Sequence, residues 1–499
     1  MYYSGNIGVS LHKLQKDCIG HISYIQLESP DIDSKAILME DLAQAAIDAA
    51  LTTGASFADV RIENSTTTII ELNDGITRQS MASRLRGAGI RAFIDGAWAF
   101  AQTTDLTRDG MKETAKSVAK LAMATRKKVG ERFSIDGPAY EDKVELKVKR
   151  PFESVTIDEK MQFAQLIDNQ AREFDQRIVS TRTIYGELTS ELYVANSLGT
   201  RVYLQNAIPN IISVPTAKDG PNRQRIQRSI SLRSGFEEME TKAAQNIGVT
   251  AAKLAIDLLS SKAVEGGIYD VVLDPALNGV VTHEAFGHAT EAENWIFHST
   301  VLEDKVNKEV GPEYLNISDD PTLIGKRGST EYDWEGTKTK KRYLVKDGVL
   351  TDLLNSLETS SRLGLEVNGA ARSQSFMDVP QPRMSNTFME PKDWDVEELI
   401  EETKSGILLC GFNYGYTQTA KGQFMFQASH GYTIENGELG TMVRDVSLAG
   451  NLLDILAKID AIGKDFELEP GTCTKNGQSV PTMTGGPHAR IRQVPVGGM

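Results

Sequence analysis

Two histidines and a glutamate lie close together in the stretch THEAFGHATEAE, from Thr282 to Glu293. His283 and Glu284 are adjacent, and His288 follows His283 at a spacing of five. Imidazole nitrogens bind zinc, and a neighbouring carboxylate can take a proton from water. The pattern is one residue longer than HExxH, in which the two histidines share one face of a helix. The stretch therefore predicts either a metal site with an unusual backbone or two histidines with separate partners.

The spacing of five decides what the backbone must do to bring these histidines together. In an α-helix, residues four apart differ by about 40° around the axis, whereas residues five apart differ by about 140°. A regular helix would therefore point His283 and His288 apart. A local widening to π-type hydrogen bonding returns such a pair to one face, and these widenings cluster at functional sites. Gly287 allows either that distortion or the end of the helix.

Several side chains are candidates for a third ligand. Glu291, Glu293 and His298 follow the motif closely. Cys473 lies far along the chain, in EPGTCTKNGQSVPTMTGG, where the glycines indicate a shaped loop. A lone cysteine is more often a small buried apolar residue than a ligand. From the residues alone, all four candidates stay open.

The other histidines and cysteines are interpreted without a metal. Cys410 follows an apolar run and is expected in the core, and His430 and His488 lie in glycine-containing turns, where we favour a surface role over substrate contact. Three more histidines and cysteines precede Met39, in a segment without a regular pattern: His12, Cys18 and His21. We do not expect them to bind a metal.

Composition bounds the class of protein. The 499 residues carry a net charge of -14, which argues against nonspecific binding to nucleic acid or to an anionic membrane. No apolar run approaches the roughly 20 residues that span a bilayer, and the first residues lack the pattern of a signal peptide. Three cysteines are too few for a disulfide framework. We expect a cytoplasmic protein.

The first half of the chain predicts helices and paired strands. Apolar spacing predicts a helix that Gly54 ends, and Asp-Gly pairs predict two tight hairpin turns. No phosphate-binding glycine motif interrupts this pattern, so we expect an α+β layer and not a doubly wound nucleotide-binding sheet. The predicted elements are helices at 39–55, 106–127 and 157–174, a strand at 58–62, hairpin turns within 72–77 and 93–98, and a strand pair turning at 196–199.

The second half begins near residue 235 with one long predicted helix, GFEEMETKAAQNIGVTAAKLAIDLLSSK. A strand from Ile268 to Asp274 follows, and Asp274 with Pro275 predicts a helix start that continues through the histidine motif. Strands and turns are expected to about residue 455, then a Gly/Pro-rich loop region. The expected division is a disordered extension (1–38), an N-terminal α+β domain (39–235) and a mostly β C-terminal domain with a helix carrying the metal motif (236–499).

From about Met39 to its end, the chain resembles the TldD/PmbA family of metallopeptidases. It departs from the family pattern at Asp333–Gly336, at Val367–Arg372 and at Thr474, which bears on substrate preference and subunit pairing. The resemblance rests on five stretches in this order: HEAFGHATEAE, YDWEGTKTKKRYLVKDG, VNGAARSQSFMDVPQPRMSNT, YTIENGEL and GTCTKNGQSVPT.

The resemblance implies a ligand set and a mechanism. His283, His288 and Cys473 match the family's metal ligands, and Glu284 matches its catalytic glutamate, so the chain resembles the catalytic TldD-like subunit. One Zn²⁺ per chain with an open fourth position is implied, at which a water pKa falls to about 7. Glu284 then takes the proton and delivers it to the departing amine. A thiolate ligand predicts a weak Lewis acid and a slow peptidase.

The family further implies an unfolded peptide substrate, held along sheet edges in a cavity between two subunits. The assembly would be a homodimer or a heterodimer with a PmbA/TldE-like sister subunit. Arg372, Arg383 and Asn386 either line this cavity or hold the fold, and the substrate-binding residues are otherwise unknown. Two alternatives are a noncatalytic subunit that stabilises a partner and a metal-dependent hydrolase of a non-peptide amide.

Overall fold

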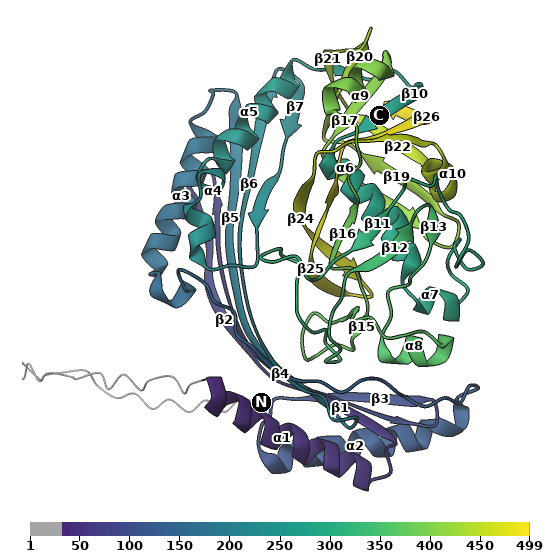
Figure 1. Ribbon diagram of the computed structural model, residues 1–499. Coiled ribbons are helices and arrows are strands. Elements are labelled where there is room, and N and C mark those ends of the chain that lie inside the picture. Colours follow the sequence, from purple (N-terminus) through teal and green to yellow (C-terminus); the bar gives the residue numbers. More distant parts are fainter. Residues whose placement is uncertain (1–31, 499) are drawn as a thin grey trace, which may run out of the picture.

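Long antiparallel strands form a curved sheet in the first half of the chain (Figure 1). The computed structural model describes residues 32–498. Asp74-Gly75 and Asp95-Gly96 all have positive φ, which confirms the two predicted hairpin turns. The strands are β1 (Phe57–Asn73), β2 (Ile76–Ile94), β3 (Ala97–Thr103), β4 (Glu141–Val144), β5 (Ile178–Asn196), β6 (Arg201–Asp219), β7 (Asn222–Arg225) and β8 (Arg228–Ser231).

Helices cover the outer, convex side of this sheet (Figure 1). In α2 (Arg108–Thr125), Met111, Ala115, Val118 and Ala122 are all buried, as their spacing predicts. The first helix begins at Ile32, seven residues before its predicted start, because the apolar pattern extends back to the buried Ala36. The other outer helices are α1 (Ile32–Thr52), α3 (Ile157–Arg172) and α5 (Ile247–Leu259).

The single helix predicted from residue 235 to 262 is wrong. Three short helices replace it: η3 (Phe236–Glu240), α4 (Lys242–Gln245) and α5. The break comes at Thr241, whose backbone is extended and whose hydroxyl accepts a hydrogen bond from the amide of Ala244 at 3.2 Å. Such a side chain caps a new helix and ends the old one. Although α5 follows the division expected near residue 235, it packs on the N-terminal sheet. We call residues 32–259 the N-terminal layer.

Residues 262–498 form the C-terminal body, in which two sheets enclose a common apolar core. One sheet contains β9 (Lys262–Ala263), β10 (Gly267–Leu273), β17 (Ser405–Cys410), β18 (Tyr414–Gln418), β19 (Gln423–Gln427), β20 (His430–Glu435), β21 (Glu438–Arg444), β22 (Val446–Asn451), β23 (Ile459–Ile462) and β26 (Ala489–Gly498). The other contains β11 (Ile317–Asp319), β12 (Arg342–Lys346), β13 (Val349–Leu350), β16 (Asn386–Met389), β24 (Glu467–Lys475) and β25 (Gln478–Gly486).

The predicted loop region after residue 455 is also wrong, because β23 to β26 lie there. Asn476 and Gly477, both with positive φ, form a tight turn between β24 and β25. Pro470 and Gly471 are tolerated because β24 is the last strand of its sheet. The α+β class is nevertheless confirmed. The smaller elements are β14 (Ala371–Arg372), β15 (Gln381–Pro382), α7 (Glu293–Ile296), α8 (Leu357–Leu363), α9 (Val396–Thr403) and α10 (Leu452–Ala457).

A buried ionic cluster joins the two parts of the molecule. In the N-terminal layer, Arg61 Nη1 donates to Asp59 Oδ1 at 2.9 Å, and Arg91 also binds Asp59. Arg91 Nη2 then donates to Glu335 Oε1 of the C-terminal body at 2.7 Å. The other oxygen of Glu335 accepts a hydrogen bond from the amide of Leu357 at 2.7 Å. Burial opposes ionisation of Asp59, but the two guanidinium groups outweigh it and lower its pKa.

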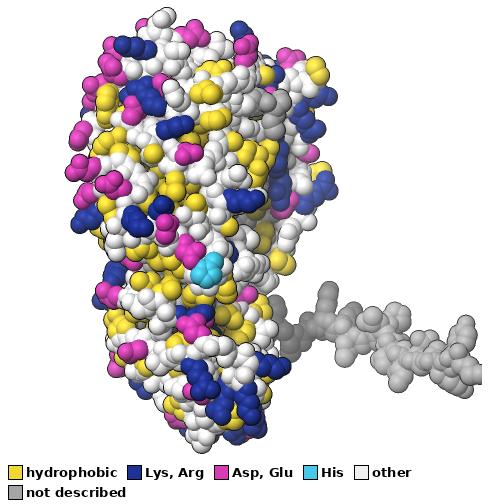
Figure 2. All heavy atoms as spheres, turned by 90° about the vertical axis from the view of Figure 1, so that its right-hand side faces the viewer, with side chains coloured by type: hydrophobic (Ala, Val, Ile, Leu, Met, Phe, Trp, Pro, Cys, Tyr) yellow, Lys and Arg dark blue, Asp and Glu magenta, His cyan; other side chains and the backbone are white. Residues whose placement is uncertain are grey.

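The surface carries charges of both signs. Figure 2 shows acidic and basic side chains interspersed over one face of the molecule. Within residues 32–498, none of the helices has the length and apolar character needed to cross a bilayer.

Candidate metal centre

The histidine motif lies on a helix that begins as predicted. Asp274 caps α6 (Pro275–Val280), with Oδ1 accepting from the amide of Leu277 at 2.8 Å. Its Oδ2 accepts from the amide of Gly411 at 2.9 Å, which ties the helix start to the end of β17. The helix then widens into the π-helix η4 (Val281–Phe286) and tightens into the 3₁₀-helix η5 (Gly287–Thr290). Of the two backbones predicted for this motif, the π-type widening is observed.

The widening brings the two imidazole rings together. The ring centroids of His283 and His288 lie 5.3 Å apart, nearly edge to face at 85°. Gly287 has a helical φ of -56°, so the position does not need glycine for its backbone angles. It needs glycine for space, because a Cβ there would lie 2.1 Å from Met384 Sδ. The close approach of Met384 thus fixes this turn against the core.

Cys473 joins the two histidines from the edge strand β24. Its Sγ lies 3.4 Å from His288 Nε2, and one ligand atom from each of the three residues falls within 4.8 Å of the others. The cysteine lies on a strand and not in the shaped loop that its glycines indicated. Arg383 holds this strand by donating to the carbonyl oxygen of Cys473 and, at 3.3 Å, to that of Gln478.

The electrostatics of this cluster favour a thiolate. Burial opposes ionisation of Cys473, but the two facing imidazoles outweigh burial and lower its pKa to about 5. Burial likewise opposes the charge on His288, but Glu291 and Cys473 raise its pKa well above the usual value. Among the described residues, His283 Nδ1 is buried without a hydrogen-bond partner. Two imidazoles, one of them with a buried unpartnered nitrogen, and one thiolate form a donor set that fits zinc.

Two acidic residues predicted as possible third ligands bind a lysine instead. Glu291 Oε2 lies 3.2 Å from His288 Nδ1, the nitrogen on the far side of the ring from Cys473. Lys475 Nζ donates to Glu291 at 2.8 Å and also binds Glu293. A carboxylate at the outer nitrogen orients a metal-binding imidazole and increases its basicity. The structure thus places Glu291 where it can orient the His288 ring, and Lys475 where it can hold Glu291. The sequence did not indicate these contacts.

The remaining third-ligand candidate lies away from the cluster. His298 has a side chain 77% exposed and pairs with Glu303. Of the four candidates, the structure brings only Cys473 to both histidines.

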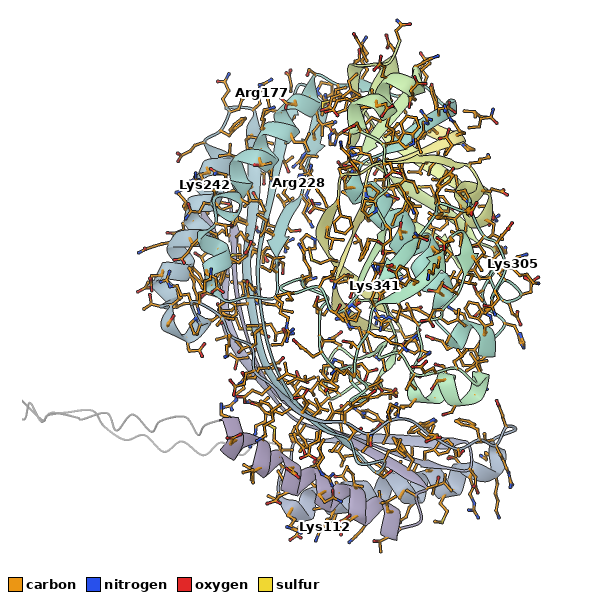
Figure 3. The ribbon with its side chains drawn as sticks, in the orientation of Figure 1. Lys112, Arg177, Arg228, Lys242, Lys305 and Lys341 are labelled. Atoms are coloured by element: carbon orange, nitrogen blue, oxygen red, sulfur yellow. The ribbon has the colours of Figure 1, made fainter. Side chains whose placement is uncertain are left out.

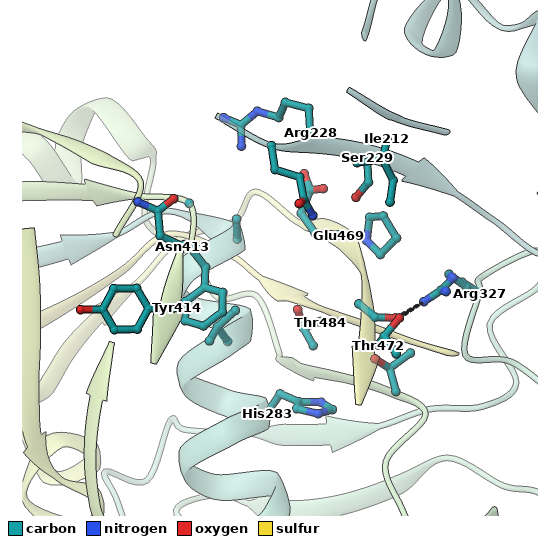
Figure 4. A pocket seen from close by; sticks show the side chains of 18 of the residues that line it. Ile212, Arg228, Ser229, His283, Arg327, Asn413, Tyr414, Glu469, Thr472 and Thr484 are labelled. Atoms are coloured by element: carbon teal, nitrogen blue, oxygen red, sulfur yellow. Dashed lines mark hydrogen bonds between the residues drawn. The ribbon is translucent and has the colours of Figure 1, made fainter. Parts of the chain in front are cut away.

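Glu284 stands between the cluster and a cleft. Its Oε2 lies 3.7 Å from His288 Nε2, and its side chain is 36% exposed. With His283 it lines a cleft of about 630 Å³, which lies between β6 and β8 of the N-terminal layer and the C-terminal body (Figure 4). The carboxylate therefore reaches both the candidate ligands and the space where a substrate would lie.

Comparisons with known proteins place the chain in a family. Three family models match it: PmbA/TldA metallopeptidase domain 1 over residues 58–122, the central domain over 150–259 and the C-terminal domain over 266–498. A protein of Methanothermobacter thermautotrophicus named metalloprotease is 37% identical over 442 residues, covering 89% of this chain and 95% of that protein. The chain belongs to the TldD/PmbA family.

Other family members extend this picture. A protein of Saccharolobus solfataricus named zinc metalloprotease TldD homolog is 28% identical over 449 residues, which cover 89% of this chain and 97% of that protein. A solved Thermotoga maritima structure, described as a candidate modulator of a DNA gyrase, has a TM-score of 0.75 at 25% identity, covering 92% of this chain and all of that one. TldE of Thermococcus kodakarensis shares the fold, with a TM-score of 0.73 at 19% identity and the same coverage.

Three residues in a family motif, for which the sequence left cavity and structural roles open, make structural contacts. Arg372 Nη1 donates to the carbonyl oxygen of Met384 at 2.6 Å, and Asn386 Nδ2 donates to that of Asp320 at 2.6 Å. Arg383 holds β24, as described above. All three side chains are buried, and none of them lines the cleft.

The five family stretches contain none of the remaining histidines and cysteines. Cys410 is buried in an apolar cluster, as predicted. The surface role predicted for His430 is wrong, because its side chain is buried, with Nδ1 2.9 Å from Ser429 Oγ. Its position on β20, paired with β17 inside a sheet, explains this burial. His488 Nδ1 lies 2.8 Å from Asp465 Oδ2. The predictions for His12, Cys18 and His21 fall outside the described residues.

Proposed function

We propose that this TldD/PmbA family member is a zinc metallopeptidase that hydrolyses unfolded peptides. The observation that carries the proposal is the gathering of His283, His288 and Cys473 beside Glu284 at the wall of a cleft. These side chains come from a π-helix, from the 3₁₀-helix that follows it and from an edge strand far along the chain. Relatives named metalloprotease and zinc metalloprotease support the same activity.

The two imidazoles and the thiolate would hold one zinc ion per chain. A bound zinc would supply Lewis acidity, polarising a carbonyl and lowering the pKa of water to about 7. Glu291 would keep the His288 ring oriented, with its Nε2 toward Cys473. Lys475 would keep Glu291 ionised, because burial opposes that charge while His288 and Lys475 lower its pKa to about 2.

Glu284 would act as general base and general acid. Its partly exposed carboxylate lies at the cleft wall, close to His288. There it would accept the proton of the attacking water and then deliver that proton to the departing amine. Because Glu284 Oε2 lies 3.7 Å from His288 Nε2, this proton transfer would take place next to the candidate metal ligands.

The cleft suits an extended peptide. Its lining includes residues 469–472 of β24, which is the last strand of its sheet, so within the described residues no strand pairs with its outer edge. An extended peptide can hydrogen-bond to such an edge through its main chain, with little dependence on sequence. A cleft of this size between two layers admits a single unfolded chain more readily than a folded domain.

The assembly and location belong to the same proposal. We expect a dimer, either of two such chains or with a TldE-like sister subunit, and the fold shared with TldE supports a pair of similar subunits. The thiols of Cys410 and Cys473 are free, which suits the cytoplasm.

The test is a hydrolysis assay on zinc-loaded protein, with and without a sister subunit. Unstructured peptides, a folded protein and small non-peptide amides would be offered in parallel, and products identified by mass spectrometry. The proposal expects cleavage of the unstructured peptides alone, lost in Glu284→Gln. Cleavage of small amides only would favour a non-peptide hydrolase. Zinc-free protein without activity, which still stabilises a partner, would favour a noncatalytic subunit.

A further inference from the structure

The cleft beside the candidate metal centre is richer in positive charge than the rest of the chain. Three arginines line it, against two carboxylates, although the whole chain has a net charge of -14. Figure 3 shows Arg228 on the side of the N-terminal layer that faces the C-terminal body, whereas Lys112 and Lys242 lie on the outer, helical side. The charged residues lining the cleft are Arg225, Arg228, Arg327, Glu284 and Glu469.

Arg327 is anchored next to the candidate metal ligand on β24. Its Nη1 donates to the carbonyl oxygen of Gly471 and, at 3.3 Å, to Thr472 Oγ1, the two residues that precede Cys473 (Figure 4). Among the described residues no carboxylate pairs with Arg327, and its Nε is buried without a partner. Burial lowers its pKa to about 10, so the guanidinium keeps its charge at neutral pH.

Arg228 approaches the cleft from the opposite wall. It is the first residue of β8, and its Nη1 would lie 3.7 Å from a Cβ added to Gly411 of the C-terminal body. Within residues 32–498 it makes no ion pair or side-chain hydrogen bond. The nearby carboxylate of Asp274 accepts hydrogen bonds from two backbone amides, one at each oxygen. Burial raises the pKa of Glu469, although the charge of Arg228 opposes this shift. Neither carboxylate neutralises Arg228 by contact.

We propose that Arg327, with Arg228 opposite, binds a carboxylate of the peptide substrate, so that the site prefers peptides with a negative charge close to the scissile bond. This inference rests on the proposed peptidase function. A guanidinium offers a planar set of donors that matches a carboxylate, and a half-buried unpaired charge gains most from such a partner. The carboxylate is either an acidic side chain or the free C-terminus of the peptide.

The test compares the affinities of matched peptides for zinc-loaded Glu284→Gln protein, which binds without turnover. One pair has both ends blocked and differs only by Glu against Gln. The other lacks acidic side chains and differs only by a free or amidated C-terminus. We expect the acidic member of one pair to bind about 10- to 100-fold more tightly at fixed salt, measured by fluorescence anisotropy.

Second substitutions in that protein assign the preference to the arginines. Arg327→Gln should abolish it, Arg327→Lys should keep part of it, and Arg228→Gln should weaken it. Arg108→Gln is the matched control, because Arg108 is exposed on α2, one turn before Lys112 on the outer side. If Arg327→Gln does not fold by circular dichroism, Arg327→Lys and Arg228→Gln carry the test.

Each outcome decides the inference. Equal affinities within both pairs, including no measurable binding, would overturn it, as would a preference that persists in all arginine variants. The pair that responds identifies the source of the carboxylate. Preference for acidic peptides without any cleavage by the wild type would refute the peptidase function alone, whereas cleavage without that preference would refute the carboxylate site alone.

Discussion

Two buried polar clusters of this molecule differ in how their groups are paired. In the cluster that joins the two parts, Asp59 and Glu335 balance Arg61 and Arg91, although two nitrogens of Arg61 have no partner within the described residues. In the candidate metal centre, a thiolate and two imidazoles face one another with a buried nitrogen unpartnered. The first set is balanced by its own charges, whereas the second brings three potential metal ligands within 4.8 Å of one another.

The comparison separates a structural cluster from a binding one. Buried ion pairs lose much of their attraction to desolvation, so the balanced cluster mainly fixes how the two parts sit together. Potential metal ligands that meet from a π-helix, a 3₁₀-helix and an edge strand gain their full stabilisation only when a cation binds. Changes in the first cluster should therefore affect stability, and changes in the second should affect metal binding and turnover.

The largest effect is expected from Glu284→Gln. Removing the general base should reduce peptide hydrolysis by about 10²- to 10⁴-fold, because the carboxylate moves protons in both halves of the reaction. Zinc content should stay the same, since Glu284 is not a proposed ligand. Steady-state kinetics and elemental analysis on the same preparation measure both quantities. Unchanged hydrolysis would remove Glu284 from the mechanism.

Glu335→Ala tests the balanced cluster. It leaves Arg91 buried with only Asp59 as a partner, so the free energy of unfolding should fall by about 3–5 kcal/mol. Urea denaturation measures the loss. Glu366→Ala is the control, because Glu366 pairs with Lys340 at an exposed site and its loss should change the free energy of unfolding far less. If folded Glu335→Ala protein loses its zinc, the two clusters are not separate.

Glu291→Gln sharpens the account of the metal centre. Without a charged acceptor at His288 Nδ1, zinc affinity should fall by about 10- to 100-fold. Chelator competition gives the dissociation constants. Glu293→Gln should have a smaller effect, since Glu293 contacts Lys475 and not the imidazole. Equal losses in both variants would argue that Lys475 and its charge balance matter more than the ring contact.

The smallest effect concerns His430, away from both clusters. Burial and Arg228 lower its pKa from 6.5 to about 4, so between these pH values only the unfolded chain takes up the proton. Stability should therefore fall as pH drops below 6.5, by about 1 kcal/mol at pH 5.5 from this residue. Unfolding of the wild type and His430→Gln across this range isolates the contribution. Parallel pH profiles would show that His430 titrates normally.

The regular parts of the fold could be predicted because their signals are local. Asp-Gly pairs gave the two hairpins, and Asp274 with Pro275 gave the start of the motif helix. The helix break at Thr241 was missed because the apolar spacing continues across it. The last strands were missed because glycine and proline suggested loops, whereas an edge strand tolerates both.

The candidate site also has a part that local sequence predicts and a part that it does not. The spacing of His283 and His288 predicted a π-type turn from local geometry alone. Cys473 lies 185 residues away from His288, so no spacing rule could choose it over Glu291 or His298, and only the family resemblance did. The contacts of Glu291 and Lys475 depend on how β24 meets the motif helix, which the sequence does not reveal.

The central claim is that His283, His288 and Cys473 together hold zinc. Elemental analysis of protein purified without chelators tests it most directly, comparing wild type with His283→Ala and Cys473→Ala, and with His298→Ala as a control outside the cluster. We predict about one zinc per chain in the wild type and the control, and loss of zinc in the other two variants. Wild-type protein that stays free of metal after zinc is supplied, or ligand variants that keep it, would contradict the account.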